Sequence, residues 1–60
     1  MKRYKIIIDL IKKTKILKAY TELEAEAVAR VESFPVWCNG ATIYKNGEIV
    51  AVYKNGEKIN

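Results

Sequence analysis

The side chains that most often carry enzyme chemistry are scarce in this sequence. It contains no histidine, which removes the imidazole base of catalytic triads and a common ligand of zinc. Its single cysteine, Cys38, has neither a histidine nor a second cysteine that could activate it or share a metal ion. We therefore expect Cys38 to be a small, half-buried apolar side chain beside Trp37.

Two further patterns could be mistaken for a pair of catalytic carboxylates or a phosphate-binding loop, but the spacing of their residues does not fit either site. The carboxylates of Glu22, Glu24 and Glu26 lie around the start of a predicted helix, where they stabilise the positive end of the helix dipole. Every glycine follows an asparagine, which is typical of turns and not of a phosphate-binding loop. The three glycines are Gly40, Gly47 and Gly56. We therefore predict a non-enzymatic protein with no cofactor, no metal ion and no small-molecule substrate.

The chain is short and basic. Its 60 residues include 11 Lys or Arg and 7 Asp or Glu, which gives a net charge of +4. This length predicts a single small domain, residues 1–60, with a thin core. No apolar run is long enough to span a membrane or to form a signal peptide, so we expect a cytoplasmic protein. Abundant Lys, Ile, Tyr and Glu without Gln is compatible with an A+T-rich or thermophilic genome, including that of a virus.

Residues 3–21 are predicted to form a β-hairpin. Branched and aromatic residues dominate 3–10, and apolar residues alternate with polar ones over 15–20. With Lys12 and Lys13 at the centre of the loop, Ile8 would pair with Leu17. One face then carries Tyr4, Ile6, Ile8, Leu17 and Ala19. The other face carries Lys5, Ile7, Asp9, Ile16, Lys18 and Tyr20.

A helix is predicted to begin after Thr21 and to end near Ser33. Thr21 and Glu24 have the spacing of a capping box, in which the threonine hydroxyl accepts a hydrogen bond from the amide of residue 24. Pro35 disfavours a helical conformation of the preceding residue and so ends the helix. Apolar residues at helical spacing predict the stripe that packs on the sheet. This stripe consists of Leu23, Ala27, Val28, Val31 and Phe34.

A second hairpin is predicted around Asn46 and Gly47, a pair that favours a type I′ turn. That turn would place Ile43 opposite Val50. The face toward the helix would carry Ala41, Ile43, Val50 and Val52. The opposite face would carry Thr42, Tyr44, Ile49, Ala51 and Tyr53.

Together these elements predict an α+β domain in the order β-β-α-β-β. One helix would pack on one face of a four-stranded antiparallel sheet with the strand order 2-1-3-4. A second Asn-Gly pair, at 55–56, would add a short fifth strand with Ile59 opposite Val52. Trp37 lies in the connection after the helix, and we interpret it as a plug at the open end of the core. The alternative is a contact with a partner.

The sheet face away from the helix is the unusual surface, because antiparallel sheets normally present polar residues to water. An apolar patch on this face predicts a partner, either a second copy of the chain or another protein. We interpret the chain as a small binding module of the kind that modulates or inhibits a larger protein. The predicted partner-binding residues are Ile7, Ile16, Tyr20, Tyr44, Ile49 and Tyr53.

Single-stranded nucleic acid is the alternative ligand of this face. Bases stack on tyrosines of a sheet, and nearby lysines neutralise phosphates. The phosphate contacts would be Lys5, Lys12, Lys13, Lys15 and Lys18. The isoleucines favour a protein partner, since bases gain little from stacking on aliphatic side chains. A third interpretation gives the face no special role, because tyrosine is common in strands and a positive net charge favours solubility.

Overall fold

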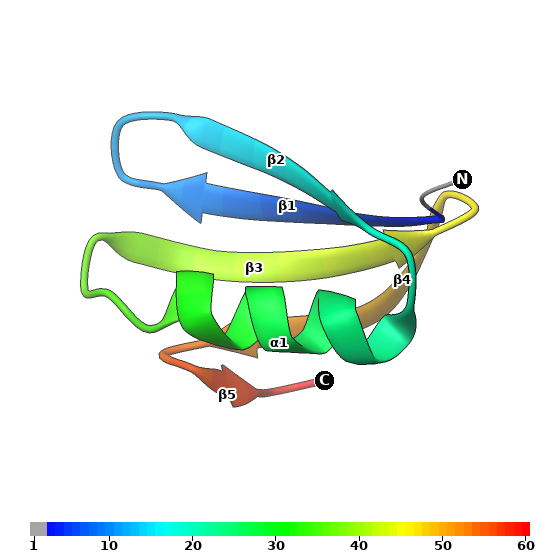
Figure 1. Ribbon diagram of the computed structural model, residues 1–60. Coiled ribbons are helices and arrows are strands. Elements are labelled where there is room, and N and C mark those ends of the chain that lie inside the picture. Colours follow the sequence, from blue (N-terminus) through cyan, green and yellow to red (C-terminus); the bar gives the residue numbers. More distant parts are fainter. Residues whose placement is uncertain (1–2) are drawn as a thin grey trace.

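The computed structural model describes residues 3–60, which form a five-stranded antiparallel sheet with one helix on one face (Figure 1). The elements are β1 (Tyr4–Leu10), β2 (Thr14–Ala19), α1 (Glu22–Ser33), β3 (Cys38–Lys45), β4 (Glu48–Lys54) and β5 (Glu57–Lys58). The strand order across the sheet is β2-β1-β3-β4-β5. The predicted α+β architecture and strand order are therefore confirmed, and the short fifth strand forms.

The first hairpin keeps the predicted faces, although its register differs by two residues. Leu17 pairs with Ile6 and not with Ile8. The turn comes one residue earlier than predicted, since the Leu10 amide donates to the Lys13 carbonyl oxygen at 2.9 Å. A shift of two residues leaves every side chain on its own face. The buried members of this hairpin are accordingly Tyr4, Ile6, Ile8 and Ala19.

Two of the three Asn-Gly pairs, at 46–47 and 55–56, form the predicted turns. The third, Asn39-Gly40, lies inside β3, so the expectation of a turn there was wrong. Asn46 and Asn55 have φ angles of 53° and 55°, and the glycines that follow them have 80° and 79°. Positive φ at both central residues is the requirement of a type I′ turn. The second turn returns the chain along β4, where the Ile59 amide donates to the Val52 carbonyl oxygen at 2.8 Å.

β4 contains one extra residue, Val50, and this bulge changes the faces of the strand's second half. Ile43 pairs with Ala51 and not with Val50. A one-residue bulge moves every following side chain to the opposite face. Ala51 and Tyr53 were predicted on the open face, but both lie in the core at 1% exposure. Val52 was predicted in the core and instead shares the face of its pairing partner Thr42.

α1 begins with the predicted cap. The Thr21 hydroxyl accepts a hydrogen bond from the Glu24 amide at 3.1 Å. The Glu24 carboxylate reaches one residue further back than expected and accepts from the Tyr20 amide at 2.7 Å. The first bond satisfies an orphan amide of the helix start, and the second fixes the residue that precedes the cap.

The side of α1 that packs on the sheet differs from the prediction. Its fully buried residues are small, namely Ala25, Ala29 and Ser33. Of the predicted stripe only Val28 packs against the core, and the larger side chains face outward. Tyr53 and the buried isoleucines fill the sheet side, so a close approach of the helix leaves room only for small side chains. The prediction of a buried Leu23, Val31 and Phe34 was therefore wrong.

Ser33 fixes the C-terminal end of α1 to the turn between β4 and β5. Its hydroxyl accepts from the Gly56 amide at 3.1 Å and lies 3.3 Å from the Arg30 carbonyl oxygen, to which it donates. A Cβ atom on Gly56 would come within 2.8 Å of the Phe34 ring, so the turn also contacts this ring closely.

Candidate functional site

No element within residues 3–60 covers the sheet face away from α1, and one row of mostly apolar residues crosses this open face. Strand pairing brings one residue of each of β1 to β4 into the row, and Ile59, which directly follows β5, extends it. From β2 to β5 the row consists of Ile16, Ile7, Thr42, Val52 and Ile59. Ile16 and Ile59 are 56% and 60% exposed, and the inner three are half-buried. At about 4.8 Å between strands, this apolar row is about 19 Å long.

Two rows of different charge flank the apolar row. The first contains Lys18, Lys5, Tyr44 and Ile49, so two ammonium groups lie side by side on β2 and β1. The second has mixed charge and contains Thr14, Asp9, Gly40, Lys54 and Glu57. The open face therefore has an apolar centre with a basic corner over the first hairpin.

The structure brings most of the predicted partner-binding residues together on this face. Ile7, Ile16, Tyr44 and Ile49 lie there, as predicted. Tyr53 does not, because the bulge turns it under α1, where the Arg30 guanidinium lies 5.8 Å from its ring centroid.

Three further residues differ from their predicted positions or were not predicted on the open face, namely Tyr20, Val52 and Ile59. Tyr20 follows the end of β2 and is 56% exposed. Val52 and Ile59 belong to the open face, although the sequence placed Val52 in the core. Their pairing was predictable from the second Asn-Gly turn, but their face depended on the bulge at Val50.

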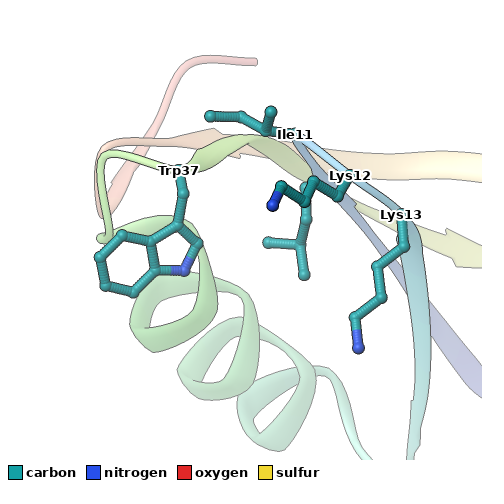
Figure 2. Close-up of a pocket in the computed structure, with 5 residues that line it drawn as sticks. Ile11, Lys12, Lys13 and Trp37 are labelled. Atoms are coloured by element: carbon teal, nitrogen blue, oxygen red, sulfur yellow. The ribbon is translucent and has the colours of Figure 1, made fainter.

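Trp37 lies beside the β1–β2 loop at a hollow of about 540 Å³ (Figure 2). Leu10, Ile11, Lys12, Lys13 and Trp37 line this hollow. The Ile11 amide donates to the Trp37 carbonyl oxygen at 3.0 Å and so joins the two loops. The indole is 58% exposed, so the interpretation of Trp37 as a plug of the core was wrong.

The five lysines predicted as phosphate contacts are spread over three places. Lys5 and Lys18 lie on the open face, whereas Lys12 and Lys13 line the hollow at Trp37. Lys15 lies on the helix side of β2, because it pairs with the buried Ile8. These positions do not form one continuous track for a nucleic-acid backbone.

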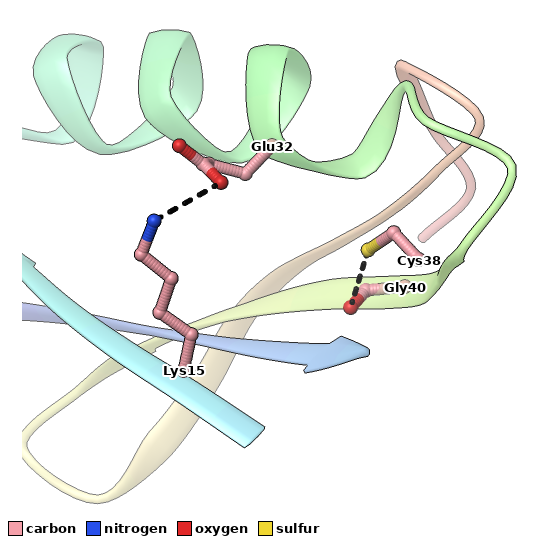
Figure 3. A network of polar contacts seen from close by, with 4 residues as sticks. All are labelled: Lys15, Glu32, Cys38 and Gly40. Atoms are coloured by element: carbon pink, nitrogen blue, oxygen red, sulfur yellow. Dashed lines mark hydrogen bonds and ion pairs between the residues drawn. The ribbon is translucent and has the colours of Figure 1, made fainter. Parts of the chain in front are cut away.

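A second view of the helix side shows what Lys15 and Cys38 contact (Figure 3). The Lys15 ammonium lies 3.7 Å from a carboxylate oxygen of Glu32. Both side chains are partly exposed, so this pair contributes at most about 1 kcal/mol. Cys38 is more deeply buried than predicted, at 5% exposure, and its thiol lies 3.5 Å from the Gly40 carbonyl oxygen.

Comparisons with protein-family models, with curated proteins and with solved structures found no match. Within the part of the chain that the structure describes, no three Cys, Asp or Glu side chains form a group that could hold a metal ion. The described helix is too short and too polar to cross a membrane.

Proposed function

We propose that the chain is a non-enzymatic binding module that docks on another protein through the open face of its sheet. The observation that carries this proposal is the apolar row from Ile16 to Ile59, which crosses four strands and the segment just after β5. One-sided antiparallel sheets normally present polar side chains to water. A contiguous apolar strip with charged residues at its rim is instead typical of a protein interface.

The size of the open face fits a modest, reversible interface. Four strands about 4.8 Å apart and about 20 Å long, with the two residues of β5 beside them, present roughly 400 Å². A partner would bury a similar area, which gives about 800 Å² in total, the size of a weak and transient interface. A transient complex is therefore expected, in keeping with a module that modulates or inhibits a larger protein.

The charges of the face favour a partner surface with an acidic side. Lys5 and Lys18 are paired on neighbouring strands, and Asp9 is the acidic residue of β1 on this face. A complementary partner would present an apolar ridge with carboxylates along the edge that meets the first hairpin. Such complementarity mainly raises the association rate and sets the orientation of docking.

The test compares two glutamate variants that differ only in the surface they change. Ile49→Glu puts a carboxylate on the open face at a side chain that is 56% exposed. Val36→Glu makes the same kind of change at an 89% exposed residue that lies in the loop before β3. Both variants should keep the circular dichroism spectrum of the wild-type protein, because neither side chain belongs to the core.

Binding is measured with a purified partner obtained by affinity capture and then titrated in isolation. We expect Val36→Glu to bind like the wild-type protein and Ile49→Glu to bind at least about tenfold more weakly, because a partner would bury its carboxylate beside the apolar row. Equal binding by both variants would contradict a role of the open face. An unfolded Ile49→Glu would contradict the assignment of this side chain to the exposed side.

Single-stranded nucleic acid is the second candidate, because Lys18, Lys5 and Tyr44 are neighbours in one row. Tyr53 is buried, so Tyr44 is the stacking platform that remains on the strands of this face. Fluorescence anisotropy with oligo-dT and oligo-U tests this candidate. Binding with a log–log salt slope near −0.7 per phosphate contact, flattened by Lys5→Ala and Lys18→Ala, would replace the proposed protein partner.

A further inference from the structure

α1 carries a second apolar surface, on the side that faces away from the sheet. Leu23, Val31 and Phe34 are 78%, 69% and 72% exposed, and Ala27 between them is also exposed. At 100° per residue these four side chains fall within an arc of about 80°, opposite the buried alanines. We call them the outer stripe. Figure 1 shows no other part of the described chain over this side of α1.

The outer stripe is not explained by the packing of the domain itself. A surface helix normally presents polar residues on the side opposite its buried face. Here the small residues face the sheet and the large apolar ones face solvent. A helix that is apolar on two opposite sides is expected to pack against two neighbours. Among residues 3–60 the sheet covers one side of α1, and on the other side the Phe34 ring touches the turn at Gly56 but stays 72% exposed.

We propose that the outer stripe is the interface of a homodimer, in which two copies of α1 pack antiparallel around a two-fold axis. A two-fold interface must be complementary to itself. The outer stripe meets this condition, since Leu23 and Phe34 lie at its two ends and Ala27 lies near its middle. In an antiparallel pair, each Leu23 would pack beside Phe34 of the other copy. The small alanines near the axis would allow the helices to approach closely.

The charges of α1 select this antiparallel orientation. The acidic residues Glu22, Glu24 and Glu26 lie in the first half of the helix. The second half carries Arg30 and Glu32, and Glu32 is paired with Lys15, so the negative charge is concentrated at the first half. A parallel pair would bring both sets of carboxylates together. An antiparallel pair separates them and opposes the two helix dipoles favourably.

The same orientation pairs unlike charges across the interface. Glu26 and Arg30 are four residues apart and therefore lie on one flank of the outer stripe. In the single chain the Arg30 guanidinium lies 5.8 Å from the ring centroid of Tyr53, so the dimer requires this side chain to turn toward the other copy. A two-fold axis midway between Leu23 and Phe34 brings Glu26 of one copy beside Arg30 of the other, and the symmetry repeats this contact. This self-complementarity favours a second copy of the chain over an unrelated protein as the occupant.

The dimer would make the chain bivalent, a consequence that rests on the proposed function of the open face. Each helix lies between its own sheet and the other helix, so the two open faces point in opposite directions on the outside. Both apolar rows stay accessible, and one dimer could bridge two partner molecules. The dimer interface itself does not depend on what the open face binds.

Sedimentation equilibrium over roughly 5–500 μM protein tests the dimer, because its population depends on protein concentration. We expect the apparent mass to rise from 6.9 kDa toward twice that value. Val31→Glu, which changes an exposed side chain of the outer stripe, should keep the mass at 6.9 kDa throughout. Ile49→Glu introduces the same charge on the open face and should dimerise like the wild-type protein.

A charge exchange tests the antiparallel arrangement separately. Glu26→Arg and Arg30→Glu should each weaken dimerisation by about fivefold, since two exposed pairs are lost. The double variant should return to within about twofold of the wild-type dimerisation constant. Circular dichroism spectra of all variants establish that the fold is retained.

Three results would overturn the proposed dimer. The first is a wild-type mass that stays at 6.9 kDa at the highest concentration. The second is a dimer that Ile49→Glu dissociates and Val31→Glu leaves intact, which would place the second copy on the open face. The third is a double charge variant that dimerises no better than the single variants. A failure of partner binding at the open face, by contrast, would leave the dimer standing.

Discussion

Tyr44 and Tyr53 form a matched pair that tests the bulge in β4. Both tyrosines begin the same pentapeptide, Tyr-Lys-Asn-Gly-Glu, and both lie in strands that enter an Asn-Gly turn. Tyr53 lies in the core at 1% exposure, whereas Tyr44 is half-buried on the open face. The same truncation to alanine should therefore have very different effects on the free energy of unfolding.

The magnitude of each effect follows from burial. Removing a buried aromatic side chain costs about 3–5 kcal/mol, and loss of the cation–π contact with Arg30 adds roughly 0.5–1 kcal/mol. A domain of this length holds about 3–9 kcal/mol in total, so Tyr53→Ala should remove half of it or more. Tyr44→Ala loses cross-strand contacts on a half-buried face and should cost about 0.2–1 kcal/mol.

Urea unfolding followed by circular dichroism measures both losses. Tyr53→Leu provides a second variant that keeps much of the volume, in case Tyr53→Ala is unfolded without denaturant. We expect the order of stability to be wild type, Tyr44→Ala, Tyr53→Leu and Tyr53→Ala. A larger loss for Tyr44→Ala than for Tyr53→Ala would refute the bulge and return Val52 to the core.

Three further substitutions or measurements test local features of the fold. Thr21→Ala should lower the free energy of unfolding by about 0.5–2 kcal/mol, because the amide of residue 24 loses its acceptor; unchanged urea unfolding would mean that the helix begins elsewhere. Ser33→Ala should cost about 1–2 kcal/mol and speed the hydrogen exchange of the Gly56 amide, which loses its acceptor; unaltered Gly56 protection would contradict this contact. Trp37 should fluoresce at long wavelength and be quenched readily by acrylamide, since its indole is 58% exposed; blue, protected emission would contradict its position.

The features that the sequence predicted correctly are set by short-range interactions. The turns at Asn46-Gly47 and Asn55-Gly56 and the Thr21 cap depend on residues within one turn of the chain. Asn39-Gly40 lacks alternating runs on both sides and continues β3 instead of forming a turn. The strand order followed from the uninterrupted apolar run Ile6–Ile8, which needs neighbours on both sides. These local signals agree with one another, which is why the α+β architecture could be derived without the structure.

The bulge and the rotation of α1 could not be derived in this way, because packing decides both. Residues 49–53 are apolar at every position, so the alternation that would fix their faces is absent. The helix has alanines on one side and larger apolar residues on the other, and hydrophobicity alone favoured the larger ones. Close contact with a sheet that already contains Tyr53 instead favours the small side. Whether the side chains of the helix and the sheet fit together depends on both segments, so the sequence of either one alone does not predict which side of α1 is buried.

The two exposed apolar surfaces have a common origin in the thinness of this domain. Half of the residues are apolar, and a two-layer domain of this length cannot bury all of them. Pairing of two helices would produce four layers, sheet, helix, helix and sheet, which covers the outer stripe and leaves both apolar rows exposed. Pairing through the open faces would instead leave two outer stripes in solvent, each with side chains more exposed than those of the apolar row. The helix side is therefore the better place for a second copy of the chain, and the open sheet face the better place for a different protein.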